Sequence, residues 1–352
     1  MAVDQVVASA SPGDAVTNAA FALRGLLRGL GPSELFAHHV DPRLAGEVHH
    51  LSEYRGGRGD IVVYHASVGE PAVTAFLLER PQDLVLVYHN ITPARYFAGI
   101  DPGFARLLAA GRAELALLRD RVALALALSA YNAADLAALG YPDVRLSPLV
   151  FDPAHLTGTT PDRAMAERLD ALDGPLVLFV GQLLPHKRLD LLLGAYHVCC
   201  TYLVPEARLA VVGPTRSAPY RSALERMIGE LSLEAWITGW VTDAELAALY
   251  RRADCFVTMS EHEGVCVPLL EAMAFEVPVV ARDLAAVAET TDGAALLLPP
   301  GSDVILAGEA IAAVVDDRAT ARSLAAGGRD RMSRWDPDAH RATFLRHLAE
   351  VV

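Results

Sequence analysis

Short runs of hydrophobic residues alternate with amphipathic stretches along most of the chain. The runs are rich in Val, Leu, Ile and Ala and end in polar residues, which is typical of buried parallel strands. The strands expected on this basis are 60–65, 83–89, 124–129 and 144–147 in the first half, and 175–181, 208–213, 235–239, 255–259 and 277–281 in the second. Amphipathic helices are expected between them, for example over 189–204 and 243–252. This alternation predicts parallel sheets built from strand-helix-strand units.

The length of the chain predicts two domains. A single hydrophobic core seldom grows beyond about 250 residues, and this chain has 352. The polar, turn-rich segment 152–174 separates the two groups of predicted strands and is the expected hinge. We therefore expect an N-terminal domain over 1–158 and a C-terminal domain over 173–335.

Composition and charge narrow the class of protein. Hydrophobic residues make up 53% of the chain and charged residues 21%, as in a globular protein with an ample core. No apolar run approaches the ~20 residues of a membrane span, and the first residues lack the pattern of a secretion signal. The four cysteines have no metal-type spacing. These features predict a cytoplasmic protein with reduced thiols, no integral membrane segment and no metal site.

The formal net charge is −13, and no basic face stands out, so neither nucleic acid nor anionic lipid is an expected partner. Against this background, Lys187 is the only lysine of the chain. A lysine serves phosphate groups as a flexible point charge, whereas arginine offers a rigid fork. A chance position on a solvated loop is the alternative for Lys187.

Ligands of parallel sheets gather beyond the carboxyl ends of the strands. Polar residues follow predicted strands at 89–90, at 182–187 and at 260–268. In the last segment Pro268 suits the first turn of a helix, and the backbone amides just before it would attract a phosphate. Those amides belong to Val265, Cys266 and Val267.

Two glutamates flank this helix start. Glu263 would project from the loop toward the ligand, and Glu271, one turn into the helix, could reach a sugar hydroxyl. The alternative is that Glu271 only favours the positive end of the helix dipole and that Glu263 is solvated.

These motifs make the chain similar to retaining glycosyltransferases of family four. The similarity rests on 180–188, on the Glu263 to Glu271 element and on 277–281 with Glu289. It extends more loosely to 88–93, where a His-Asn-Ile-Thr-Pro element resembles a bacterial subgroup. The resemblance implies the GT-B fold, an α/β architecture of two facing Rossmann-like domains with a cleft between them. It also implies that the last helix, within 336–352, returns to the N-terminal domain.

The resemblance assigns roles to individual residues. Lys187 would hold the diphosphate, Glu271 the ribose and Glu263 the hydroxyls of the transferred sugar. His89 would meet the donor sugar near the reacting centre, the alternative being a core histidine at the end of a strand. The other implied donor contacts are Gly13, Gln182, Arg188, Val241, Gly264, Val265, Cys266 and Val267.

Two positions depart from the family pattern. Gln182 stands where an arginine usually partners the lysine, so Arg188 or another residue would have to supply the second cation. Cys266 replaces a frequent glycine, and we expect it to be a buried small side chain rather than a reactive thiol.

The implied activity is the transfer of a hexose from a UDP- or GDP-sugar to a hydroxyl of a glycan, glycolipid or small natural product. It would proceed with retention, without a metal and without a cofactor. Removal of Lys187 is then expected to abolish transfer and to spare the fold. Two alternatives remain open: a catalytically silent nucleotide-sugar sensor, suggested by Gln182, and a phosphorylase-like enzyme using pyridoxal phosphate.

Overall fold

The computed structural model describes residues 1–351, which fold into two compact α/β units. Unit 1 comprises Met1–Phe151 and the chain from Asp336 onward, and unit 2 comprises Asp152–Trp335. The expected hinge segment 152–174 therefore lies wholly in unit 2. It is not an open linker, because it forms α5 (Ala154–Thr157) and α6 (Arg163–Asp170).

The sheet of unit 1 is entirely parallel, with the strand order β3-β2-β1-β4-β5-β6-β7. Its strands are β1 (Val3–Ala10), β2 (Leu35–Val40), β3 (His49–His50), β4 (Ile61–Ala66), β5 (Asp83–Tyr88), β6 (Val122–Ala127) and β7 (Val144–Leu146). The order in which strands join the sheet reverses direction at β1, because β2 and β3 lie on one side of β1 and β4 to β7 lie on the other. Ligands of such sheets bind at this switch point, beyond the carboxyl ends of the strands.

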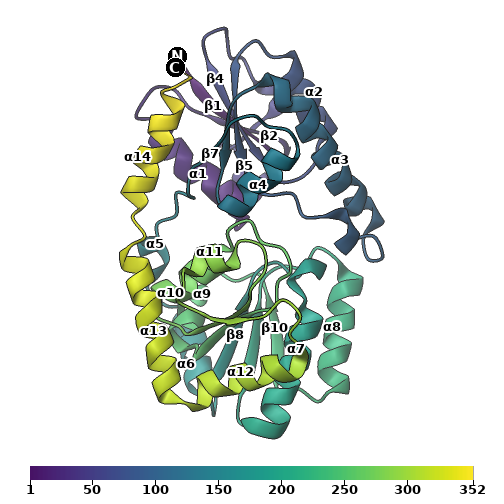
Figure 1. The fold of residues 1–352 in the computed structure, drawn as a ribbon, viewed down its shortest axis with the longest axis vertical. Helices are drawn as coiled ribbons and strands as arrows, with labels where there is room; N and C mark the ends of the chain where they lie inside the picture. The colour runs from purple at the N-terminus through teal and green to yellow at the C-terminus, as the bar shows by residue number, and fades with distance from the viewer. Residues whose placement is uncertain (352) are drawn as a thin grey trace. The chain divides into compact units, whose positions relative to one another are not determined.

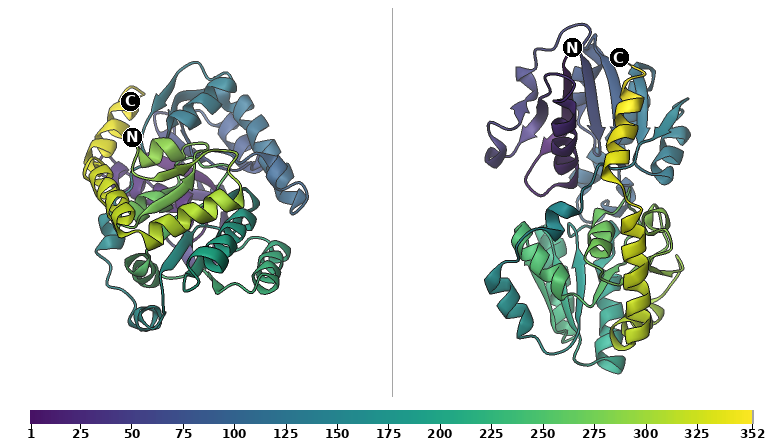
Figure 2. Two further views of the ribbon diagram at one scale, coloured as in Figure 1. Left: turned by 60° about the horizontal axis from the view of Figure 1, so that its bottom comes forward. Right: turned by 90° about the vertical axis from the view of Figure 1, so that its left-hand side faces the viewer.

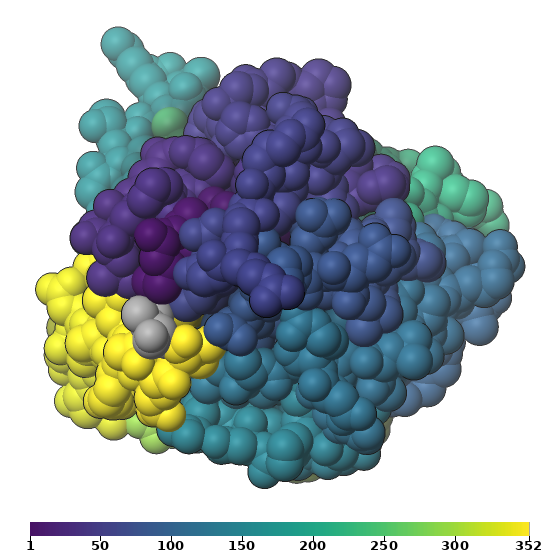
Figure 3. All heavy atoms as spheres, turned by 90° about the horizontal axis from the view of Figure 1, so that it is seen from above, coloured from purple at the N-terminus to yellow at the C-terminus, as the bar shows by residue number. Residues whose placement is uncertain are grey.

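Helices cover both faces of this sheet (Figure 1). On one face lie α1 (Ala15–Leu27) and α14 (Pro337–Leu348), and on the other α2 (Pro71–Glu79) and α3 (Pro102–Leu118), with α4 (Ala130–Ala138) following β6. Helix α14 contributes Phe344 and Leu348 to the same buried cluster as Leu23 and Leu27 of α1. Figure 3 shows α14 lying against the N-terminal residues of unit 1.

The sheet of unit 2 is also entirely parallel, with the order β10-β9-β8-β11-β12-β13. Its strands are β8 (Leu176–Val180), β9 (Arg208–Val212), β10 (Ala235–Gly239), β11 (Cys255–Thr258), β12 (Val279–Arg282) and β13 (Leu296–Leu298). Its later helices are α7 (Leu189–Val198), α8 (Ala218–Glu230), α9 (Asp243–Arg252), α10 (Val267–Ala274), α11 (Val287–Thr291), α12 (Val304–Asp316) and α13 (Arg318–Ser333). Figure 2 shows these helices on both sides of the strands.

Alternate residues of the unit 2 strands serve two different packing layers. Val177 and Phe179 of β8 face the cluster that contains α7 and α12. On the other face, Tyr250 of α9 stacks on Phe256 of β11 with an interplanar angle of 27°. Both faces are covered, as expected for a parallel sheet.

All nine strands expected from the sequence are present, with ends shifted by a few residues. Four strands were not expected: β1, β2, β3 and β13. Helix α7 ends at Val198, and the expected continuation is a π-helical turn over Cys199–Leu203. Short 3-10 turns cover Pro42–Leu44, Leu51–Glu53, Ala94–Tyr96, Arg119–Arg121 and Pro185–Lys187. None of the helices within residues 1–351 has the length and apolar character needed to cross a membrane.

Candidate active site

Lys187 and Glu263 form an ion pair beyond the carboxyl ends of two neighbouring strands. Lys187 closes the 3-10 turn that follows β8, and Glu263 lies in the loop after β11. The Nζ atom of Lys187 donates to Oε1 of Glu263 at 2.6 Å. The two loops are also joined through the backbone, where the amide of Glu261 donates to the carbonyl of His186 at 2.8 Å. The structure thus brings these two predicted residues together.

Both charges of this pair are shielded from water. The side chains of Lys187 and Glu263 are 16% and 7% exposed. Burial disfavours the ammonium, but attraction to Glu263 outweighs it, so the pKa of Lys187 is raised above its ordinary value. Lys187 is therefore a permanent positive charge at neutral pH. Glu263 is not the solvated loop residue of the alternative reading.

Arg188 is not available as a second cation for a phosphate, because its charge is already paired with carboxylates. It adopts a left-handed backbone conformation with φ 49° at the start of α7. Its guanidinium binds Asp190 at 2.8 Å and also binds Glu261. A second guanidinium, that of Arg282 at the end of β12, lies 3.2 Å from Glu261. Gln182 is exposed, and the guanidinium groups of Arg188 and Arg282 are already paired with carboxylates.

Helix α10 begins at the loop that carries Glu263. Its N-cap is Cys266, which has φ 65° and ψ 71°, a left-handed conformation that favours glycine. The thiol is buried, and burial together with Glu263 raises its pKa well above the ordinary value. Cys266 is thus the small buried side chain that the sequence predicted. The backbone amides of Val265, Cys266 and Val267 lie at the positive end of the helix.

Glu271 lies in α10 and contacts α9 of the same unit. The hydroxyl of Tyr250 donates to Oε2 of Glu271 at 2.8 Å. Burial raises the pKa of Glu271 to about 7, although the tyrosine hydrogen bond favours the ionised form. The other carboxylate oxygen is left for a further hydroxyl donor.

Three glycines close the carboxyl ends of β8, β9 and β10. Gly181 and Gly213 have φ 153° and 138°, and a Cβ atom on Gly213 would lie 2.1 Å from the carbonyl oxygen of Gly181. The amide of Gly213 donates to the carbonyl of Gly239 at 2.9 Å. A side chain at position 213 would therefore clash with the backbone just before Gln182. Val241, another predicted donor contact, follows β10 on the same edge.

Unit 1 holds the two remaining predicted residues. Gly13 has φ 76° in the turn between β1 and α1, and Asp14 caps α1 through the amide of Thr17 at 2.8 Å. His89 follows β5 directly, and its Nε2 atom lies 2.9 Å from Nδ1 of His65. The predicted residues are therefore divided between the two units.

Sequence reasoning missed several partners of these residues. Tyr250, Arg282 and His65 were not singled out, although Arg282 ends a strand and could have been found by the rule applied to Lys187. Tyr250 and His65 lie inside regular elements, where only a buried polar atom in the fold reveals them.

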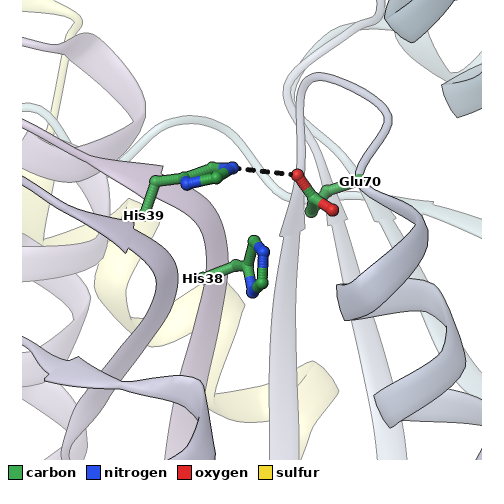
Figure 4. Close-up of side chains that lie close together, drawn as sticks. All are labelled: His38, His39 and Glu70. Carbon is green, nitrogen blue, oxygen red and sulfur yellow. Dashed lines mark hydrogen bonds and ion pairs between the residues drawn. The ribbon is translucent and has the colours of Figure 1, made fainter.

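One group of side chains among residues 1–351 has a composition suited to a metal ion. His38, His39 and Glu70 offer atoms within 4.8 Å of one another at the carboxyl ends of β2 and β4 (Figure 4). The Nε2 atom of His39 lies 3.1 Å from Oε2 of Glu70, so a hydrogen bond accounts for this contact without an ion. The side chain of His39 is 65% exposed.

Comparison with known proteins identifies the domain that carries Lys187 and Glu263. Residues 162–331 match the family model "Glycosyl transferases group 1". The matched segment makes up most of unit 2. Two relatives are similar over part of the chain. O-antigen chain mannosyltransferase B of Escherichia coli is 32% identical over 158 residues, which is 42% of this chain and 40% of that protein. The GDP-mannose-dependent alpha-mannosyltransferase of Mycobacterium tuberculosis is 29% identical over 237 residues, 66% of this chain and 58% of that protein.

The likeness in fold extends beyond the group 1 domain. HepE of Anabaena, solved in complex with UDP and glucose, superposes with a TM-score of 0.78 over 99% of this chain and all of that one, at 17% identity. This likeness shows the fold, two Rossmann-like α/β units of the GT-B type. The chain spans less than two thirds of the length of the curated relatives named above.

Proposed function

We propose that this protein is a retaining, metal-independent glycosyltransferase of family four, from the bacterial subgroup with a His-Asn-Ile-Thr-Pro element. It transfers a hexose from a nucleotide-diphospho-sugar to an acceptor hydroxyl. The observation that carries the proposal is the shielded pair of Lys187 and Glu263 beside the start of α10. A permanent cation next to free helix amides suits a diphosphate, and a fixed carboxylate suits sugar hydroxyls.

In this proposal each residue has one task. Lys187, Gly264 and the amides of residues 265–267 hold the diphosphate. Glu263 keeps Lys187 in place with one oxygen and accepts a hydrogen bond from the transferred sugar with the other. Glu271 binds the ribose, and His89 contacts the donor sugar. Gln182, Arg188, Val241 and Gly13 line the donor site in supporting roles.

The difficult step is departure of the nucleoside diphosphate, which leaves an oxocarbenium-like sugar. Negative charge grows on the leaving phosphate during this step. Lys187 and the α10 amides are held in place by the fold before this charge develops, so little reorganisation is needed. The acceptor hydroxyl then attacks the anomeric carbon from the face of the departing group and passes its proton to the phosphate. The anomeric configuration is thereby retained.

The names of two relatives favour one donor. One is a mannosyltransferase and another is called GDP-mannose-dependent, so GDP-mannose is the first donor to test. UDP-glucose is the second, because the solved HepE structure contains UDP and glucose. The acceptor is a hydroxyl of a glycan, glycolipid or small natural product.

The deciding experiment measures release of the nucleoside diphosphate from each donor, first with water alone and then with a panel of sugar and lipid-linked acceptors. We expect release with one donor, unchanged by EDTA, and a product whose anomeric proton coupling matches that of the donor sugar. Lys187→Met is the matched control, since it keeps the length of the side chain and removes its charge. Inversion at the anomeric carbon, or equal turnover in the control variant, would overturn the proposal.

A silent nucleotide-sugar sensor is a second candidate, favoured by one observation. Arg188 is neutralised by Asp190 and Glu261, and Gln182 is uncharged, which leaves Lys187 with less help at a leaving diphosphate. A sensor would show a donor-dependent rise in melting temperature with the donor intact after prolonged incubation. A pyridoxal phosphate enzyme is disfavoured, because the only lysine of the chain is engaged by Glu263.

A further inference from the structure

Three polar side chains lie in a row on one face of the unit 1 sheet. Gln5 belongs to β1, His65 to β4 and His89 follows β5, and these three strands are adjacent. The register pairs Val7 with His65 and His65 with Val87. Because side chains two apart share a face, all three polar residues point to the side covered by α1 and α14.

The direction of the hydrogen bonds along this row is fixed at its inner end. Nε2 of Gln5 donates to the carbonyl of Ala20 in α1 at 3.0 Å. A flipped amide would place its oxygen against that carbonyl, so Oε1 of Gln5 must face the other way. It lies 2.9 Å from Nε2 of His65. An amide oxygen only accepts, and therefore Nε2 of His65 carries a hydrogen.

The protonation state of His65 then determines which nitrogen of His89 carries the hydrogen. His65 is completely buried, and burial lowers its pKa well below the ordinary value, with a smaller effect from His89. A neutral imidazole with its hydrogen on Nε2 has a lone pair on Nδ1. Nε2 of His89 lies 2.9 Å from Nδ1 of His65, so it must donate to that lone pair.

His89 consequently has its single hydrogen on Nε2 at neutral pH. Burial lowers the pKa of His89 to about 4, so a second proton is not added in the physiological range. Its Nδ1 atom carries a lone pair on the other side of the ring and makes no hydrogen bond to residues 1–351. His89 stands at the carboxyl end of β5, the edge where ligands of parallel sheets bind.

We infer that Gln5 and His65 are positioning residues that hold His89 in the Nε2-hydrogen tautomer, so that Nδ1 accepts a hydrogen bond from one hydroxyl of the donor sugar. This inference deepens the proposed function and rests on it for the identity of the ligand. It makes His89 a selector for a hydroxyl group, and it excludes His89 as a proton donor to the leaving group. A sugar that lacks this hydroxyl leaves the lone pair unsatisfied and is rejected.

A purely structural role for the row makes a different prediction. A buried pair of histidines that only stabilises unit 1 would affect all donors equally when it is disturbed. The tautomer relay acts on one hydroxyl and one ring nitrogen, so its loss changes selectivity.

The first test reads the tautomer directly and needs no activity. Long-range nitrogen-proton spectra of the intact protein, labelled with 15N in its histidines, distinguish a protonated ring nitrogen from a bare one. We expect His89 to show a protonated Nε2 and a bare Nδ1. Gln5→Glu should reverse this pattern, because a buried carboxylate favours the doubly protonated His65, whose Nδ1 then donates to His89. A wild-type His89 with its hydrogen on Nδ1 would overturn the inference.

The second test measures selectivity with a panel of monodeoxy donor analogues. Wild-type protein should discriminate against one analogue by tenfold or more in kcat/KM. His65→Phe should lose that discrimination and lower kcat with the natural donor by about tenfold to a hundredfold, with free-nucleotide affinity unchanged. Thr74→Val is the matched control, since Thr74 is a buried hydrogen-bonded residue of α2 on the opposite face.

The outcomes separate this inference from the proposed function. Equal losses for every donor in His65→Phe and in Thr74→Val would reduce the row to a structural role and overturn the inference. No transfer by wild-type protein with any donor would instead overturn the proposed function, and the spectra would still report the tautomer.

Discussion

The Nζ atom of Lys187 lies 2.6 Å from Oε1 of Glu263, and both side chains are largely shielded from water. Removing one partner would leave the other charge buried and unpaired, which costs about 3 kcal/mol. Lys187→Met should therefore lower the free energy of unfolding by about that amount and reduce transfer at least a hundredfold. The sequence alone led to a different expectation, namely that loss of Lys187 spares the fold because no core volume is removed. Urea unfolding and nucleotide release measure the two effects.

The double variant Lys187→Met with Glu263→Gln is the control for this prediction. It removes both charges, so most of the lost stability should return while transfer stays low. Recovery of transfer in the double variant would show that the charge of Lys187 has no part in the reaction.

Cys266 occupies a backbone conformation that glycine adopts without strain. Cys266→Ala keeps the Cβ atom in this left-handed geometry, whereas Cys266→Gly removes it, which relieves about 1 kcal/mol. The glycine variant should therefore unfold at a higher urea concentration than the alanine variant. Ala342→Gly in the exposed face of α14 provides the contrast, since glycine should destabilise an ordinary helical position by about 1 kcal/mol. If glycine were less stable than alanine at position 266, as it should be at position 342, the left-handed geometry of Cys266 would be contradicted.

Glu271 should make stability depend on pH near neutrality. Its pKa is raised from 4.5 to about 7 by burial, so the folded state holds a proton that the unfolded state has released. Its contribution to stability is complete below pH 4.5 and is lost as the pH rises through about 7. Glu271→Gln should thus be more stable relative to wild type at pH 8 than at pH 5.5, by on the order of 1–3 kcal/mol.

Nucleotide binding provides an independent test of the protonation state of Glu271. An ionised Glu271 accepts the ribose hydroxyl better than a protonated one, so binding of free nucleotide near pH 7 should release a proton. Isothermal titration in two buffers with different ionisation enthalpies measures this release. Glu271→Gln should abolish it, and Glu263→Gln should preserve it. A proton release that survives in Glu271→Gln would assign it to another group.

Helix α14 completes the core of unit 1. Phe344 and Leu348 are 2% and 1% exposed in the cluster that contains β1, β4, β5 and β6. Phe344→Ala should cost about 3–4 kcal/mol of stability, whereas Arg346→Ala, on the exposed side of the helix, should cost little. Removing the chain after Trp335 should likewise lower the melting temperature and the transfer rate. A truncated protein with both quantities unchanged would show that α14 is dispensable.

The sequence predicted the parts of the fold that repeat a simple pattern. Strands such as β5 and β9 are uninterrupted apolar runs, and α9 carries a capping box between Thr242 and Glu245 that marks its start. Strand β1 was not predicted, because Asp4 and Gln5 interrupt its apolar pattern. In the structure each has a specific partner: Asp4 accepts from the amide of Glu34 at 2.9 Å, and Gln5 belongs to the histidine row.

The candidate site was predicted as a set of residue types and not as a set of contacts. Lys187 and Glu263 were found because each follows a strand, but their mutual ion pair joins residues that are 76 positions apart in sequence. The engagement of Arg188 by Glu261 depends on the side-by-side placement of β8 and β11. Such pairings follow from the order of strands in the sheet, which the hydrophobic pattern does not encode.

Unit 1 is assembled from two stretches of chain separated by the whole of unit 2. A ribosome therefore finishes unit 2 before it has made the helix that covers the apolar face of unit 1. At ~5–20 residues per second, the interval between Phe151 and Phe344 lasts roughly ten to forty seconds. During this time Leu23, Leu27 and their neighbours are not yet covered by α14. The nascent chain therefore exposes an apolar surface to which chaperones can bind, while unit 2 can already fold.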